Sequence, residues 1–284
     1  MKRIIRVFPR RTNATPEDVL AIVGRKPGLL DEADEVRVSV TFTYDKPRAE
    51  KLAKQWKAVA PVTIGGPAYD DFGNDFTPGL YVRRGYVVTT RGCPNKCWFC
   101  SAWKREGSII RELPIMDGYN VLDSNLLAAS ERHIRAVFDM LRHQRERAEF
   151  SGGFEAKRLR AWHADLLLSI RVAQVWFAYD TPDDLEPLIV AGKLLREAGC
   201  RPSTLRAYVL VGFPKDTMVK AEKRLRDTYA NGFLPMAMLY RDKDGKTTQP
   251  WRRFARLWIR VPTVKAMLKS GESARIVEES LIST

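Results

Sequence analysis

The strongest constraint on the fold is an alternation of strand-like and helix-like segments in the middle of the chain. Six segments have the short apolar pattern of β-strands, and helical periodicity fills most of the gaps between them. The six strand segments cover residues 86–90, 119–122, 148–151, 172–179, 205–211 and 235–240. Repeated strand–helix units of this kind predict an α/β fold whose parallel sheet curls into a partial (β/α)6, TIM-like barrel.

The predicted helices between these strands cover residues 126–145, 183–198 and 216–229. Asp183 or Asp184 is expected to cap the second of them. Before the repeat, strand patterns at residues 3–8, 36–42 and 62–64 and a helical pattern at 47–59 predict a small α/β unit with a parallel crossover. After it, a basic segment predicts a helical extension. We therefore expect three parts, over residues 1–80, 81–242 and 243–284.

Composition excludes several classes of protein. The chain has 284 residues, of which 45% are hydrophobic and 29% are charged, which is the balance of a globular protein. No window approaches 18 uncharged apolar residues, and no apolar stretch follows the basic start of the chain, so neither a membrane span nor a secretory signal is expected. The sequence therefore predicts a cytoplasmic protein without a membrane partner.

Three of the four cysteines lie within eight residues and have the spacing C-x3-C-x2-C. They are Cys93, Cys97 and Cys100, and they follow the strand pattern of residues 86–90. In parallel α/β barrels the chemistry lies at the carboxyl ends of the strands, which is where this loop is expected. A structural zinc site needs a fourth nearby ligand, but the nearest histidine is His133 and the fourth cysteine is Cys200. Three thiolates without a fourth suit an iron–sulfur cluster with one open iron.

This cysteine spacing, with Phe99 just before the last cysteine, resembles the radical SAM superfamily. The segments Ile64-Gly65-Gly66-Pro67 and Leu122-Asp123-Ser124-Asn125 are similar to its cobalamin-domain-containing branch, with a reduced N-terminal domain. The resemblance implies that Cys93, Cys97 and Cys100 hold a [4Fe-4S] cluster. It further implies that S-adenosylmethionine (SAM) chelates the fourth iron and is cleaved to a 5′-deoxyadenosyl radical for hydrogen abstraction. An external flavodoxin- or ferredoxin-like electron donor follows from that chemistry.

The resemblance also implies contacts to SAM. The superfamily's Gly-Gly-Glu motif follows the second strand, where this chain has Asp123 and Asn125, whereas Glu155 closes a similar segment after the third strand. The contact to the methionine ammonium stays open between these positions, and Glu155 has the alternative role of capping or solvating a helix start. The predicted cofactor-binding residues are Phe99, Asp123, Asn125, Ser151, Gly152, Gly153, Glu155 and Tyr179. No catalytic residue is assigned on the substrate side.

The net charge of +14 is concentrated in the last third of the chain. Residues 1–85 carry a net charge of +4, residues 86–200 carry +1 and residues 201–284 carry +9. A predicted helix at 251–260 places Phe254, Leu257 and Trp258 on one face, with arginines at 252, 253, 256 and 260. Either the aromatics only dock the helix and the arginines stay solvated, or the arginines guide an anionic substrate such as RNA.

Two functions from different classes follow. The first is a radical SAM enzyme whose substrate is unknown and includes nucleic acid among its candidates. The alternative is a non-catalytic iron–sulfur or zinc protein that binds nucleic acid through its basic C-terminal region. Six strand–helix units favour the enzyme, because a small binding module does not need them.

Overall fold

A computed structural model describes residues 2–71, 76–242 and 244–270, with side chains up to residue 268. The chain divides into two compact units, Met1–Gly118 and Tyr119–Thr284. Both units combine parallel strands with helices, which confirms the predicted α/β class. Of the predicted C-terminal extension, residues 243 and 271–284 lie outside the described residues. Within the described ranges, no helix is long and apolar enough to cross a membrane.

The first unit is built on a four-stranded parallel sheet with the strand order β2-β1-β3-β4. Its strands are β1 (Ile4–Phe8), β2 (Ala21–Val23), β3 (Glu35–Ser39) and β4 (Val62–Gly65), and α1 (Lys46–Trp56) connects β3 to β4. The remaining elements are the short strands β5 (Tyr86–Val87), β6 (Thr90–Arg91) and β7 (Arg111–Glu112), the helix α2 (Ala102–Glu106), and 3-10 turns at Thr43–Asp45 and Pro67–Tyr69.

The core of this unit lies between α1 and the sheet. Leu52, Ala53 and Trp56 recur at helical spacing and are buried against the alternating Val36 and Val38 of β3. The predicted helix and the β3–α1–β4 parallel crossover are confirmed. The strand β2 is absent from the sequence prediction, because three residues are too few to show a periodic pattern.

The Gly65-Gly66 turn that follows β4 packs on the protein itself. Gly66 has φ +98°, and a Cβ built on it would lie 2.9 Å from the backbone nitrogen of Val40. The backbone N–H of Val40 donates to the carbonyl of Gly65 at 3.0 Å, and the N–H of Ala68 donates to the carbonyl of Val40 at 2.9 Å. Glycine is therefore required here by contact with the end of β3.

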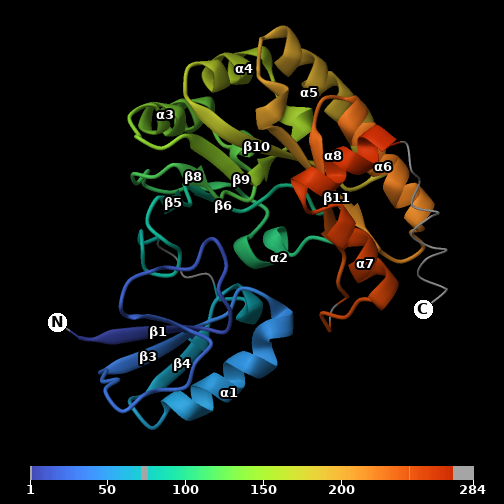
Figure 1. The fold of residues 1–284 in the computed structure, drawn as a ribbon. Helices are drawn as coiled ribbons and strands as arrows, with labels where there is room; N and C mark the ends of the chain where they lie inside the picture. Colours follow the sequence, from blue (N-terminus) through green and yellow to red (C-terminus); the bar gives the residue numbers. More distant parts are fainter. Residues whose placement is uncertain (1, 72–75, 243, 271–284) are drawn as a thin grey trace. The chain divides into compact units, whose positions relative to one another are not determined.

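The second unit contains five strands of a larger parallel sheet, in the order β12-β11-β10-β9-β8 (Figure 1). The strands are β8 (Asn120–Val121), β9 (Ala148–Phe154), β10 (Val172–Tyr179), β11 (Leu205–Val211) and β12 (Leu234–Leu239). The helices are α3 (Glu131–Arg142), α4 (Ala161–Leu168), α5 (Leu185–Glu197), α6 (Met218–Ala230), α7 (Gln249–Leu257) and α8 (Val261–Ser270). Short 3-10 turns lie at Leu126–Ala128, Ala156–Arg158, Pro182–Asp184 and Pro202–Thr204.

Helices α3, α4, α5 and α6 follow one another along the same side of these strands (Figure 1). Between helices and strands runs a series of aromatic contacts. The rings of Phe138, Phe150, Phe154, Phe177 and Phe233 meet in sequence at centroid distances between 4.9 and 5.8 Å, and each is at most 2% exposed. This aromatic core links α3 to the neighbouring strands β9 and β10 and to Phe233, the residue just before β12.

Two predicted elements differ in detail from the structure. The segment at 86–90 divides into β5 and β6, because Thr90 and Arg91 pair antiparallel with Glu112 and Arg111 of β7 instead of continuing a parallel strand. The predicted helix at 126–145 begins only at Glu131. Ser130 caps it by accepting a hydrogen bond from the backbone N–H of His133 at 3.2 Å, and a 3-10 turn precedes this cap.

The expected cap of α5 also differs. The Asp184 carboxylate accepts hydrogen bonds from the backbone N–H and the hydroxyl of Thr181, at 2.8 and 2.9 Å. It faces the turn before the helix, and neither Asp183 nor Asp184 caps the first turn of α5 through its side chain. The capping box with Thr181 stabilises the 3-10 turn that leads into the helix.

Candidate functional site

The three clustered cysteines lie in a loop that the β6–β7 hairpin closes. The loop leaves the hairpin after Arg91, carries Cys93, Cys97 and Cys100, and returns through α2 to β7. None of the three takes part in a disulfide bond, and all three are partly exposed. The backbone N–H of Cys100 donates to the carbonyl of Cys97 at 3.2 Å, so the last two cysteines share one tight turn.

A buried carboxylate fixes the base of this loop. Glu106, whose side chain is only 6% exposed, accepts from the Arg91 guanidinium at 2.8 Å and from the backbone N–H of Gly92 at 3.0 Å. The N–H of Cys93 then donates to the carbonyl of Gly107 at 3.1 Å. The end of α2 is thereby tied to the residues just before the first cysteine.

Gly92 permits this closure. Its φ is +97°, and a Cβ on it would lie 2.2 Å from the carbonyl oxygen of Ile109. No side chain fits in that space, so the chain passes directly against the returning strand. The sequence prediction did not include Gly92, Arg91 or Glu106. Their only sequence signal is the Arg-Gly pair immediately before Cys93.

The chemistry of the donor set fits a soft metal centre, since three cysteine sulfurs share one anchored loop. In the described parts of the chain, no three His, Cys, Asp or Glu side chains are already gathered in metal-binding geometry. Beside the thiols, Phe99 packs edge-on against Trp98 at a centroid distance of 5.4 Å, and Trp98 is 54% exposed. Phe99 thus lies in the loop with the cysteines, as its sequence position requires.

A second group of predicted residues lies at the carboxyl ends of β8 and β9 in the second unit. Asn125 is buried, and its amide donates to Oε2 of Glu155 at 2.7 Å. Arg158 donates to the same oxygen at 2.7 Å. Two of the three positions that the sequence left open for the contact to the methionine ammonium, Asn125 and Glu155, are therefore hydrogen-bonded to each other. In the described residues, no hydrogen bond reaches Oε1 of Glu155.

Glu155 lies at the N-cap position of the 3-10 turn Ala156–Arg158, but its side chain forms no capping hydrogen bond. Its carboxylate, 17% exposed, is positioned by Asn125 and by the guanidinium of Arg158. Arg158 was missed by the sequence prediction, although its spacing of three residues from Glu155 is a recognisable signal for an ion pair.

Gly152 and Gly153 lie within β9 and have structural roles. β9 bulges here: the pairs Phe150–Val175 and Phe154–Phe177 enclose three residues on β9 and one on β10. A Cβ on Gly152 would lie 2.1 Å from the carbonyl oxygen of Asp123, and Gly153 has φ +95°. Gly152 therefore lets β9 pass close to the backbone of Asp123. The sequence had predicted cofactor binding for this glycine.

The remaining predicted residues are also placed. Asp123 is buried, with 1% exposure. The carbonyl of Ser151, in the bulge, accepts from the hydroxyl of Tyr208 at 3.2 Å. Tyr179 ends β10 and is buried, and this burial raises the pKa of its phenol. Among the described residues, no hydrogen bond joins Tyr179 to the Asn125–Glu155 pair.

Asp180 is the residue after Tyr179, at the carboxyl end of β10. The pKa of its carboxyl group is shifted far from the ordinary value. Burial, with the negative charge of Asp184 as the second cause, raises the pKa of Asp180 to about 7. Its backbone N–H donates to the Asp184 carboxylate at 3.1 Å. A carboxyl group that takes up its proton near neutral pH distinguishes this strand end from an ordinary surface turn.

The raised pKa of Asp180 predicts a pH-dependent stability. Between pH of about 4 and about 7 the folded chain keeps a proton that the unfolded chain releases, so stability falls as pH rises through this range. Asp180→Asn should match the wild type near pH 4 and exceed it by about 4 kcal/mol above pH 7. Urea unfolding at a series of pH values measures the difference. The exposed Asp183→Asn is the matched control, and an equal gain in that variant would contradict the prediction.

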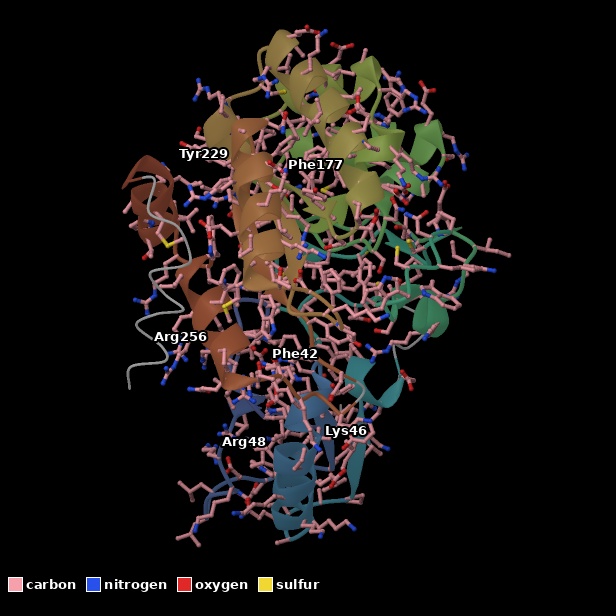
Figure 2. The ribbon with its side chains drawn as sticks, turned by 90° about the vertical axis from the view of Figure 1, so that its right-hand side faces the viewer. Phe42, Lys46, Arg48, Phe177, Tyr229 and Arg256 are labelled. Atoms are coloured by element: carbon pink, nitrogen blue, oxygen red, sulfur yellow. The ribbon has the colours of Figure 1, made fainter. Side chains whose placement is uncertain are left out.

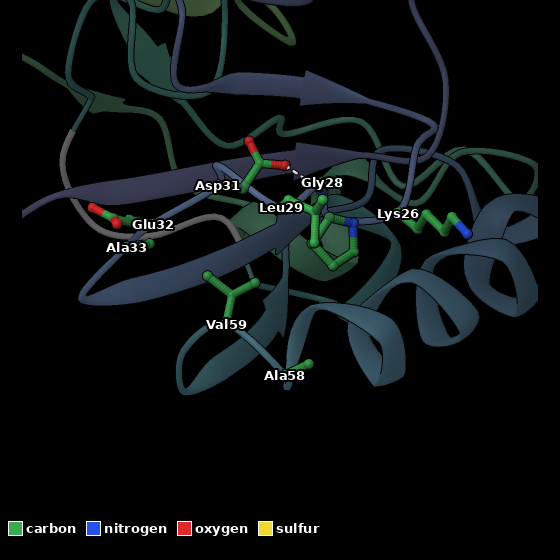
Figure 3. Close-up of a pocket in the computed structure, with 9 residues that line it drawn as sticks. Lys26, Gly28, Leu29, Asp31, Glu32, Ala33, Ala58 and Val59 are labelled. Carbon is green, nitrogen blue, oxygen red and sulfur yellow. Dashed lines mark hydrogen bonds between the residues drawn. The ribbon is translucent and has the colours of Figure 1, made fainter.

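A surface cavity of about 740 Å³ lies elsewhere in the first unit, between residues 26–33 and residues 58–59 (Figure 3). Within it, the Asp31 carboxylate accepts from the backbone N–H of Gly28 at 2.7 Å. This carboxylate also pairs with Arg25, which lowers the pKa of Asp31 to about 2. None of the predicted site residues lines this cavity.

Comparison with models of known protein families and with curated proteins finds no match to this chain. The class of protein is therefore defined by the fold and the loop alone: a two-unit α/β protein with three cysteines in an anchored loop.

Proposed function

We propose that the chain is a cytoplasmic radical SAM enzyme with a partial (β/α)6 barrel. The observation that carries the proposal is the anchored loop that brings Cys93, Cys97 and Cys100 together within eight residues, with none of them in a disulfide bond. These three residues would bind one [4Fe-4S] cluster. When bound with SAM, the cluster supplies the electron that cleaves the sulfonium to methionine and a 5′-deoxyadenosyl radical. The electron itself comes from a flavodoxin- or ferredoxin-like donor.

The chain's own residues position and shield this chemistry. Glu106 holds the start of the loop through Arg91 and Gly92, which limits the positions that Cys93 can take. Phe99 contributes apolar surface beside the thiols, and Trp98 packs against it. A fixed and partly apolar loop favours retention of the metal centre and limits access of water to it.

Glu155 and Asn125 are the proposed SAM contacts. The amide of Asn125 and the guanidinium of Arg158 both bind Oε2 of Glu155, so the carboxylate is held in one orientation. Oε1 is then the oxygen available to an ammonium group such as that of methionine. A carboxylate that is oriented beforehand loses less conformational entropy when it binds a cation.

The proposal predicts that anaerobically reconstituted protein forms 5′-deoxyadenosine from SAM when dithionite is added. Glu155→Gln should weaken SAM binding by about 10- to 100-fold, because a charge-assisted hydrogen bond to the ammonium is lost. Asn125→Ala should weaken SAM binding less than Glu155→Gln does, because it keeps the carboxylate and removes only one of the two groups that orient it. Both variants should keep the iron content of the wild type. Equilibrium binding of SAM and chromatography of the products measure these effects.

The matched control is Glu149→Gln on the same strand. Glu149 accepts a hydrogen bond from the amide of Asn120 at 3.1 Å, so it repeats the Asn–Glu arrangement without a predicted ligand. SAM affinity unchanged in Glu155→Gln, or lowered equally in Glu149→Gln, would move the SAM site elsewhere. Tetrahedral zinc in place of a reducible cluster would favour the non-catalytic alternative.

A further inference from the structure

The end of the described chain has an unbalanced charge. Between residues 249 and 270, which form α7 and α8, there are six Lys or Arg residues and no Asp or Glu. Other helices of the same unit pair their cations with acids one turn away, as in Glu131–Arg135 of α3 and Lys223–Asp227 of α6. Because α7 contains no acidic residue, its positive charge has no partner within the helix.

The apolar face of α7 is fully used in packing. Phe254, Ala255 and Trp258 are each at most 2% exposed, and the carbonyl of Trp258 accepts from the backbone N–H of Ala237 in β12 at 3.2 Å. The ring of Trp251 lies over the turn after β11, where a Cβ on Gly212 would come within 2.9 Å of it. The expectation that the aromatics dock this helix is therefore confirmed.

Docking fixes the arginines on the outer face of α7. Arg252, Arg253 and Arg256 fall within an arc of about 100° on the helix, and Arg260 follows its end. All four are exposed, and Arg256 marks this face in Figure 2. Within the described part of the chain, none of these four arginines forms an ion pair or a side-chain hydrogen bond. These four residues are called the α7 arginine face below.

Like charges one helical turn apart repel each other, as Arg252 and Arg256 do here. The packing of Trp251, Phe254 and Trp258 holds them in place against that repulsion. A polyanion would relieve it, and guanidinium groups bind phosphate with two parallel hydrogen bonds. The arrangement is therefore complementary to a chain of phosphates.

We infer that the α7 arginine face binds the phosphate backbone of a nucleic acid. An anionic membrane fits the same charge less well, because helices that bind membranes insert their apolar face between the lipids. On α7 that face is buried against β12 and the turn after β11. The inference does not rest on the proposed function, since α7 contains none of the residues assigned to the cluster or to SAM.

The test replaces Arg252, Arg253, Arg256 and Arg260 together by Gln. Binding of a labelled single-stranded RNA, and of DNA of the same sequence, is followed by fluorescence anisotropy between about 50 and 200 mM salt. Four phosphate contacts predict a slope of log K against log salt of about −3 for the wild type, from about −0.7 for each phosphate. The Gln variant should bind about tenfold or more weakly with a slope near zero, whereas replacement by Lys should keep most of the slope.

A control variant removes the same charge elsewhere in the unit. Arg135, Arg142, Lys193 and Lys223 are exposed and already paired with acids, so their replacement by Gln should leave RNA affinity within about threefold of the wild type. Three results would overturn the inference: no nucleic-acid binding by the wild type, an equal loss in the control variant, or binding to phosphatidylserine vesicles in place of nucleic acid. Affinity for RNA over DNA, or the reverse, identifies the source of the phosphates.

Discussion

Replacing Cys93, Cys97 or Cys100 by Ala is expected to abolish stable iron binding, whereas Cys200→Ala should leave it unchanged. The three loop thiols lie within eight residues, so each removal takes one of the proposed ligands. The wild type should retain about four irons per chain after anaerobic reconstitution, as expected for a cubane cluster. Each loop variant should fall to background in an iron and sulfide assay.

Cys200 lies outside the cysteine loop and is the internal control for this experiment. It follows α5 in the second unit, where its backbone N–H donates to the carbonyl of Leu195 at 2.9 Å. Burial raises the pKa of its thiol, which disfavours the thiolate form that ligates metals. If Cys200→Ala loses as much iron as the three loop variants, the assignment of the cluster to the loop is wrong.

The largest effect on folding is expected from Gly152→Ala. The added Cβ would lie 2.1 Å from the carbonyl oxygen of Asp123, and two further backbone atoms of residues 122 and 123 come within 2.8 Å. Backbone atoms cannot rotate away as a flexible side chain does, so β9 has to shift from β8. We expect a loss of about 3 kcal/mol or more in the free energy of unfolding, at the upper end for overpacking. Denaturant unfolding measures it.

Ser151→Ala is the matched control for that variant. Ser151 is the neighbouring residue of the same bulge, and its described hydrogen bonds are made by backbone atoms. Removing its hydroxyl should therefore change stability by less than about 1 kcal/mol. A Gly152→Ala protein as stable as Ser151→Ala would show that the strands separate at little cost.

Two of the three longest parallel strands could be predicted to the residue, whereas β9 extends three residues beyond its predicted end at Ser151. Segments 172–179 and 205–211 coincide with β10 and β11, because strands buried on both faces require near-continuous apolar runs that turn residues interrupt. Short elements could not be found in this way. β6 and β7 are two residues each, and their pairing depends on contact between residues twenty positions apart.

The same division, between what local sequence patterns determine and what long-range packing determines, applies to the candidate site. Sequence by itself determined the cysteine spacing, the bounds of β10 and β11 and the presence of the helix that presents the arginines, since these depend on composition and local periodicity. Only the tertiary structure decided that Asn125 and Glu155 meet, that Glu106 anchors the cysteine loop, and that the Gly152 backbone lies against Asp123. It also decided the raised pKa of Asp180. Each of these depends on which distant segments pack together, and packing is set by the whole core rather than by any local pattern.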